Sequence, residues 1–242
     1  MKITYCKISG WDGAMRSFFM TNKKYDKQIE ERLQKVEKYL ILREYGIIND
    51  DVDCEDLIWY DKIKKNVIEV GKKHTTLLRF IDITFVVDGL HRGAQDDFDS
   101  HAKRLESRIV RMSTRVRNNE KLNEVSDFYK GKIITFDDLT KQFDLPEEFV
   151  KDDKKFVRTP FGYVQDEYKD DRDVLRGNVP LAVSSMFTVK VNLTELCHIV
   201  RERAPGSAAA PELQEMIKML VDEHIHPQLG LDMEWLKNNC YQ

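Results

Sequence analysis

The stretch that most constrains this chain runs from Ile81 to Arg115, with the sequence IDITFVVDGLHRGAQDDFDSHAKRLESRIVRMSTR. Its first residues alternate and then become apolar, which predicts a strand, and a turn follows at Asp88-Gly89. A helix with three carboxylates comes next, and the stretch ends in a cationic segment containing Ser113, Thr114 and Arg115. A buried strand that leads into such a segment predicts an anion-binding site.

The periodicity of the rest of the chain predicts a mixture of helices and strands. We expect strands over residues 2–8 and 183–191, and helices over 26–45, about 54–72 and 192–203, with Pro211 opening one more. Residues 118–172 are polar and charged, and they predict an irregular insertion with one or two short helices. The sequence thus indicates one α+β domain that spans residues 1–242.

Composition excludes several classes of protein. Hydrophobic residues make up 41% of the 242 residues and charged residues 33%, and no apolar run reaches the roughly 18 residues that a membrane-spanning helix needs. The formal net charge of -3 argues against a general nucleic-acid-binding protein. The cysteines lie far apart, in no CxxC pair, so we expect reduced thiols in a cytoplasmic protein; they are Cys6, Cys54, Cys197 and Cys240.

Six cations lie within residues 103–117, against the single acid Glu106: Lys103, Arg104, Arg108, Arg111, Arg115 and Arg117. Phosphate is the natural counter-ion, because guanidinium groups bind it bidentately and Ser hydroxyls add donors. The alternative is a solvated basic face whose cations pair with the acids at 96–99. The sequence alone leaves both interpretations open.

Other polar residues carry weaker signals. Arg176 precedes a turn, and Arg203 ends the helix predicted over 192–203, where a cation complements the helix C-terminus. Asp96, Asp97 and Asp99 do not share one helix face, so a solvated surface or ion pairs with residues 103–108 are favoured over a metal cluster. His224 and His226 lack a third ligand at suitable spacing, and we expect no metal site.

The order of these pieces resembles the flavin-dependent thymidylate synthases, the ThyX family. Gly71-x-x-His74-x-Thr76 is similar to that family's Gly-His-x-Ser element, and His91-Arg92 stands in place of its Ser-Arg turn. Ser100-His101-Ala102 replaces the family's Arg-His-Arg triplet, and the segment 109–115 resembles its Ser element. Arg176-Gly-Asn-Val-Pro180 and Asn192-Leu-Thr-Glu-Leu196 resemble later motifs, so the likeness covers about 71–115 and 172–221.

The resemblance implies a ThyX-like α+β fold, with a central, mostly antiparallel sheet flanked by helices and a helical insertion. It implies a homotetramer that binds the pyrimidine nucleotide dUMP, FAD, methylenetetrahydrofolate as carbon donor and NADPH as reductant. The residues at nucleotide-binding positions are Asp97, Ser113, Thr114, Arg115, Arg176 and Arg203. Arg203 is expected beside the uracil ring, where a cation stabilises developing negative charge.

The residues at flavin-binding positions are His101, Lys103, Arg104, Arg111, Asn192 and His198. Both triplet arginines are absent, and Thr194 stands where the family has another arginine. We expect Lys103 and Arg104 to replace the missing charges. Arg111 stands at a position usually held by Glu, which inverts a charge near the flavin.

Three functions follow from this sequence. The first is a divergent enzyme that methylates or hydroxymethylates C5 of a pyrimidine nucleotide, with dUMP as the default and UMP or dCMP as alternatives. The second is a nucleotide-binding homologue that has lost flavin catalysis. The third is a nucleic-acid-binding module built on 103–117, which the acidic balance of the chain disfavours.

Overall fold

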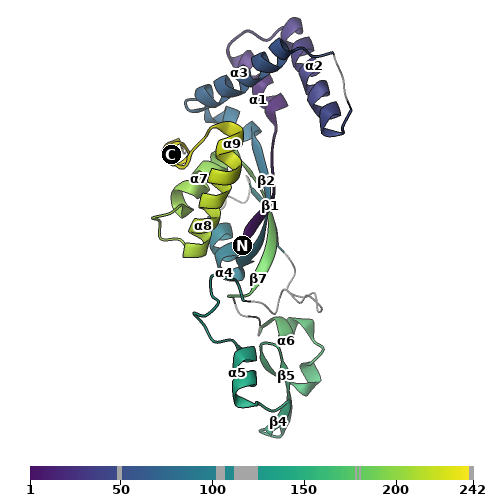
Figure 1. Ribbon diagram of the computed structural model, residues 1–242, viewed down its shortest axis with the longest axis vertical. Coiled ribbons are helices and arrows are strands. Elements are labelled where there is room, and N and C mark those ends of the chain that lie inside the picture. The colour runs from purple at the N-terminus through teal and green to yellow at the C-terminus, as the bar shows by residue number, and fades with distance from the viewer. Residues whose placement is uncertain (48–50, 102–106, 112–124, 178, 180, 240–242) are drawn as a thin grey trace.

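The computed structural model describes residues 1–47, 51–101, 107–111, 125–177, 179 and 181–239. The molecule is elongated (Figure 1). A four-stranded sheet with helices against it forms the middle, three N-terminal helices lie at one end, and a small module with its own sheet lies at the other.

The N-terminal third is one strand followed by helices: β1 (Lys2–Ser9), α1 (Trp11–Thr21), α2 (Lys27–Glu44), α3 (Cys54–Gly71) and a 3-10 turn over Thr75–Phe80. The predictions of a strand over 2–8 and of helices over 26–45 and 54–72 are confirmed. Asp26 and Asp53 cap the two long helices, because their carboxylates accept the backbone N–H groups of Ile29 and Asp56. Helix α1 was not predicted.

The central sheet is antiparallel throughout, with the strand order β1-β2-β7-β3. Its further strands are β2 (Asp82–His91), β3 (Ser107–Arg111) and β7 (Ser184–Asn192). Strand β2 pairs with β1 on one side and with β7 on the other, with Asp82 opposite Asn192 and His91 opposite Ser184. This confirms the expectation of a central antiparallel sheet.

Helices α4 (Arg92–His101), α7 (Leu193–Arg203) and α8 (Pro211–Leu220) pack against this sheet. Alternate residues of β2 are fully buried, among them Ile83, Phe85 and Val87. Phe98 of α4 is 0% exposed and lies edge-on to Phe85 and to Phe187, with ring centroids 6.3 and 5.7 Å apart. The aromatic contacts fix α4 on the two central strands.

The chain after β3 returns as a module with its own small sheet. Its elements are α5 (Phe136–Phe143), β4 (Glu148–Lys151), β5 (Lys154–Thr159), β6 (Gly162–Gln165), a 3-10 turn (Asp166–Tyr168) and α6 (Arg172–Gly177). The sequence predicted an irregular insertion here, and the structure differs by this antiparallel sheet. Phe149 holds the module together, because its ring stacks on Phe156 at 5.3 Å and lies edge-on to Tyr163 at 4.8 Å.

The C-terminal region continues from α8 through a π-helical turn (Val221–Ile225) into α9 (His226–Leu229) and α10 (Met233–Asn238). Pro211 stands in the first turn of α8, as predicted. Leu213, Met216, Ile217 and Leu220 are fully buried, which explains the apolar stripe of this helix.

We expect Phe98→Ala to lower the free energy of unfolding by about 3–5 kcal/mol, because it leaves a cavity between α4 and the sheet. Urea unfolding followed by circular dichroism measures the change. Tyr45→Ala is the control: Tyr45 is 79% exposed, so its loss should change stability by no more than about 0.5 kcal/mol. Equal effects of the two substitutions would contradict this packing.

Candidate functional site

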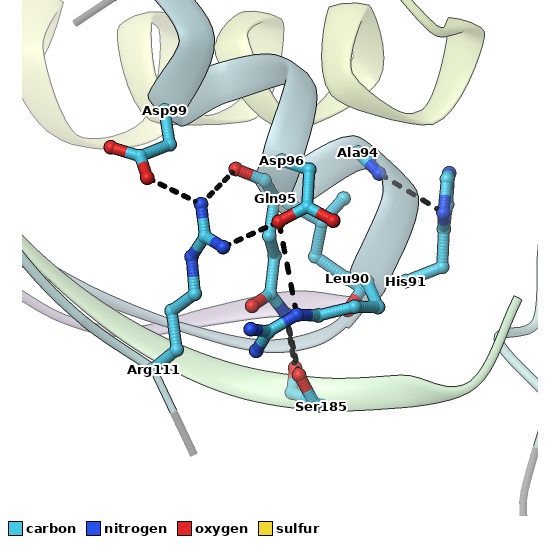
Figure 2. A network of polar contacts seen from close by, with 9 residues as sticks. Leu90, His91, Ala94, Gln95, Asp96, Asp99, Arg111 and Ser185 are labelled. Carbon is cyan, nitrogen blue, oxygen red and sulfur yellow. Dashed lines mark hydrogen bonds and ion pairs between the residues drawn. The ribbon is translucent and has the colours of Figure 1, made fainter. Parts of the chain in front are cut away.

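The junction between β2 and α4 is closed by the buried amide of Gln95. Its Nε2 donates to the Leu90 carbonyl at 2.9 Å and to the Ser185 Oγ at 2.6 Å (Figure 2). Gln95 is 0% exposed, so these bonds satisfy its donors where water cannot. The amide therefore joins the end of β2 and the start of β7 to the first turn of α4.

A second buried cluster lies beside this junction. The Glu212 carboxylate accepts the His91 backbone N–H at 3.2 Å and the Ser126 hydroxyl at 2.5 Å. The Ala94 backbone N–H donates to His91 Nδ1, which leaves the ring proton on Nε2, 3.3 Å from the same carboxylate. The cluster connects α8 to the end of β2 and to the residues before the insertion module.

His91 is 4% exposed, and its imidazole lies edge-on to the ring of Tyr129. Burial lowers the pKa of His91 below its ordinary value of 6.5, while Glu212 and the Leu181 carbonyl act in the opposite direction. The ring is therefore held neutral at neutral pH, and its role is to orient the α4 turn.

Arg111 joins β3 to α4 through three acceptors. One guanidinium nitrogen contacts the Asp96 carboxylate, and the other donates to Asp99 at 2.8 Å and to the Gln95 carbonyl at 3.0 Å (Figure 2). Two carboxylates one helical turn apart hold this cation, so its charge is neutralised within the chain. This is the pairing between the 103–117 cations and the 96–99 acids that the sequence left open, seen for one arginine.

Arg203 and Asp97 meet where the end of α7 crosses α4. Arg203 Nη2 lies 3.1 Å from Asp97 Oδ1, and Asp97 Oδ2 accepts the Ala210 backbone N–H, also at 3.1 Å. Arg203 is 7% exposed, and its Nε–H has no acceptor among the described residues. Such a buried and unsatisfied donor in a charged side chain marks this point as a candidate ligand site.

The structure brings together two of the residues predicted for nucleotide binding, Asp97 and Arg203. Arg176 belongs to α6, the last helix of the insertion module, and the position of its side chain is not described. Ser113, Thr114 and Arg115 also lie outside the described residues.

Those residues predicted for flavin binding that the structure describes are dispersed over four elements, α4, β3, β7 and α7. Arg111 is engaged as above, and Asn192 is a buried N-cap whose side-chain oxygen accepts the Glu195 N–H at 2.8 Å. His198 lies half-buried on α7. His101 is the last residue of α4 and its side chain is not described; Lys103 and Arg104 lie outside the described residues.

The described residues by themselves do not form a flavin phosphate site. Arg111 already pairs with Asp96 and Asp99, and the side-chain oxygen of Asn192 already accepts a backbone N–H at the start of α7. A flavin phosphate site in this chain would need cations from outside the described residues, such as Lys103 and Arg104.

Sequence reasoning missed His91 as a buried group, and it missed Gln95, Ser126 and Glu212 altogether. Each is a polar residue in a segment without a recognisable motif. Glu212 follows Pro211 at a helix start, which is typical of an exposed acid, yet it is 2% exposed. No pattern in the sequence predicts that Glu212 is buried.

Within the described part of the chain, no group of three or more His, Cys, Asp or Glu residues is placed to hold a metal ion. A search of the described helices also finds none that is long and apolar enough to cross a membrane.

Residues 16–228 match the family model of the thymidylate synthase complementing protein. The match covers most of the chain, so the protein belongs to this family, the ThyX family that the motif order resembles. No curated protein matches the sequence.

Two solved structures share the fold. One is the flavin-dependent thymidylate synthase ThyX from Helicobacter pylori complexed with FAD and dUMP, with a TM-score of 0.53, 16% identity and 100% coverage of both chains. The other is ThyX from Helicobacter pylori with FAD and dUMP, with a TM-score of 0.51, 17% identity and 100% coverage of both chains. At this identity the likeness establishes the α+β ThyX fold.

The buried His91 predicts a pH dependence of stability. The unfolded imidazole takes up a proton near its ordinary pKa of 6.5, and the folded one only at lower pH. The unfolded state therefore binds more protons between these values, so the contribution of His91 is complete above pH 6.5 and is lost as the pH falls through the folded pKa.

We expect the free energy of unfolding of His91→Gln to fall less steeply than that of the parent protein between about pH 7 and pH 5. Urea unfolding at several pH values measures both slopes. His226→Gln, at an exposed position on α9, is the control and should follow the parent slope. If the free energy of unfolding fell equally steeply with pH in all three proteins, the depressed pKa of His91 would be refuted.

Proposed function

We propose that the protein binds a pyrimidine mononucleotide, with dUMP as the default, and transfers a one-carbon unit to C5 of its base. The observation that carries the proposal is the buried Arg203 with its unsatisfied Nε–H, in a chain of the ThyX family. The solved relatives of this fold were obtained with FAD and dUMP, which supports the same nucleotide here.

In this proposal Arg203 donates to a carbonyl oxygen of the base and stabilises negative charge that develops on the ring. Asp97 holds the guanidinium in place through the 3.1 Å contact. Ser113, Thr114, Arg115 and Arg176 contact the nucleotide, with the first three at the phosphate. Methylenetetrahydrofolate is the proposed carbon donor and NADPH the proposed reductant, and a bound FAD supplies hydride chemistry.

The proposed flavin contacts are His101, Lys103, Arg104, Arg111, Asn192 and His198. Arg111 can contact a flavin in one of two ways. Either it keeps its ion pairs with Asp96 and Asp99 and contacts the flavin beside them, or these ion pairs break. Breaking these ion pairs would expose the carboxylates of Asp96 and Asp99 to an anionic cofactor, which is electrostatically unfavourable.

That cost favours a second candidate, a nucleotide-binding homologue that has lost flavin catalysis. It keeps Arg203 and the nucleotide site and uses Arg111 solely to hold β3 against α4. The two candidates differ in whether FAD binds.

We further propose that residues 1–242 act as one domain, with 118–172 as an insertion, and that the chain works as a homotetramer in the cytoplasm. Cys6 and Cys54 are free thiols, which agrees with a reducing compartment. In a site shared between subunits, a second subunit would supply acceptors or cations that the described residues of one chain do not provide.

The first candidate predicts a yellow protein. Purified protein should show the absorbance of oxidised flavin, or should quench added FAD fluorescence and rise in melting temperature with FAD. Arg111→Met gives the matched variant, because it removes the cation and leaves the apolar stem of the side chain. A colourless protein that neither quenches FAD nor gains thermal stability would overturn the enzyme and leave the second candidate.

Both candidates predict that Arg203→Ala weakens dUMP binding at least roughly tenfold, since a charge-assisted hydrogen bond contributes about 1.5–3 kcal/mol. Arg115→Ala should weaken it by a similar factor through the phosphate. Calorimetry with dUMP measures both, and Arg201→Ala is the control, because Arg201 is exposed and pairs with Glu202. Unchanged affinity in both test variants would refute the nucleotide site.

A further inference from the structure

A cavity of about 310 Å³ lies where the N-terminal helices α1 and α3 meet α9 (Figure 1). One wall is a single face of α3, because Asp61, Lys64, Lys65 and Ile68 lie three or four residues apart on that helix. The other walls are α9 and Trp11 of α1. Small-molecule sites in proteins measure about 300–1,000 Å³, so the cavity is large enough for a small ligand.

Three residues that line this cavity carry hydrogen-bond donors without an acceptor in the described part of the chain. They are the ammonium group of Lys65, the indole N–H of Trp11 and the side-chain amide of Gln228. Trp11 is half-buried, and the N–H of a buried indole usually has a partner. An acceptor-rich group would satisfy these donors together.

The charges of the lining residues favour an anion over a cation. Asp61 is the one acid among them, and Lys64 Nζ already lies 3.5 Å from its carboxylate. The same Nζ lies 5.0 Å from the ring centroid of Tyr60 and 5.6 Å from that of Trp11. Lys64 therefore offsets the charge of Asp61 within the chain, and Lys65 is left to pair with an external anion.

The α9 side of the cavity is shaped by the π-helical turn Val221–Ile225. Pro227 follows this turn and has no N–H to donate to the Glu223 carbonyl, so a regular α-helix would lack a hydrogen bond there. The extra residue in the turn rotates α9 by about 100° about its axis relative to a continuous α-helix. The turn thus sets which side of α9 lines the cavity, and π-helical turns are frequent at functional sites.

We propose that this cavity binds a small organic anion, a carboxylate or phosphate group carried on a single ring. The anionic group pairs with Lys65 and accepts the indole N–H of Trp11, and the ring lies against the apolar side chains of Ile68 and Leu229. The inference goes beyond the proposed function, because no residue predicted for nucleotide or flavin binding lines this cavity.

Fluorine NMR on the full chain labelled with 5-fluorotryptophan tests the inference with benzoate as the probe. The chain has three tryptophans, and tryptophan-to-phenylalanine substitutions assign their signals to Trp11, Trp59 and Trp235. We expect benzoate to shift the Trp11 signal in a saturable way and to leave the other two in place, since neither residue lines the cavity. Benzamide, the neutral isostere, should bind at least roughly fivefold more weakly, because it lacks the charge that pairs with Lys65.

Lys65→Met removes the cation and keeps an apolar stem, so it should weaken benzoate binding by about threefold to fivefold. Lys62→Met is the matched control. It also removes a lysine from the exposed surface of α3, but Lys62 does not line the cavity, so the affinity should stay unchanged. Phenyl phosphate distinguishes the two anionic groups: tighter binding than benzoate assigns the site to a phosphate, weaker binding assigns it to a carboxylate, and both results support an anion site.

A Trp11 signal that stays in place with millimolar benzoate and millimolar phenyl phosphate would overturn this inference. Equal affinity for benzoate and benzamide, or an undiminished affinity in Lys65→Met, would overturn it as well. Should Lys65→Met fail to fold, the comparison of benzoate with benzamide in the parent protein decides. Calorimetry with dUMP tests the proposed function separately, because Arg203 lies outside this cavity.

Discussion

The antiparallel pairing of β2 with β7 is the constraint on which the candidate site depends. Each of these strands leads directly into a helix, β2 into α4 and β7 into α7. Because the strands run in opposite directions, the two helices start at opposite ends of the sheet and return along the same face. The end of α7 therefore meets the middle of α4, and that meeting is the contact between Arg203 and Asp97.

Helix α4 shows how neighbouring carboxylates take different roles. Asp96 and Asp99 lie one turn apart and both face Arg111 of β3, whereas Asp97 lies on another side of the helix and faces Arg203. Phe98, between them, is buried against the sheet. The charged pairs on either side of this ring keep the helix from turning about its axis, so the orientation of Asp97 follows from contacts that involve no ligand.

Much of the fold was predictable because its signals are local. The β-branched run before Asn192, and the capping oxygen that Asn192 supplies to α7, were sufficient to place strand and helix within a residue of their observed limits. The small sheet of the insertion was not predicted. Its strands are four to six residues long and mostly half-buried. They are organised by contacts between Phe149, Phe156 and Tyr163, which the periodicity of the sequence does not reveal.

Less of the site was predictable, because its contacts join residues that lie far apart in the sequence. Motif order suggested Asp97 and Arg203 as separate positions, but their contact depends on how α4 and α7 cross, and helix crossing is a property of packing. The burial of Glu212 under Ser126 and His91 is likewise a long-range result. Arg111 reaches Asp96 and Asp99 because β3 pairs with β7 in the central sheet. The cationic sequence 103–117 did not predict a strand there.

The order of the central sheet also bears on how the molecule avoids unwanted association. Among the described strands, β1 and β3 are the two outermost, and an outer strand is where a sheet can pair with another molecule. Strand β3 is five residues long and carries Arg108 and Arg111, and β1 carries Lys2 and Lys7. Cationic side chains on both outer strands, and the shortness of β3, disfavour the growth of a continuous intermolecular sheet.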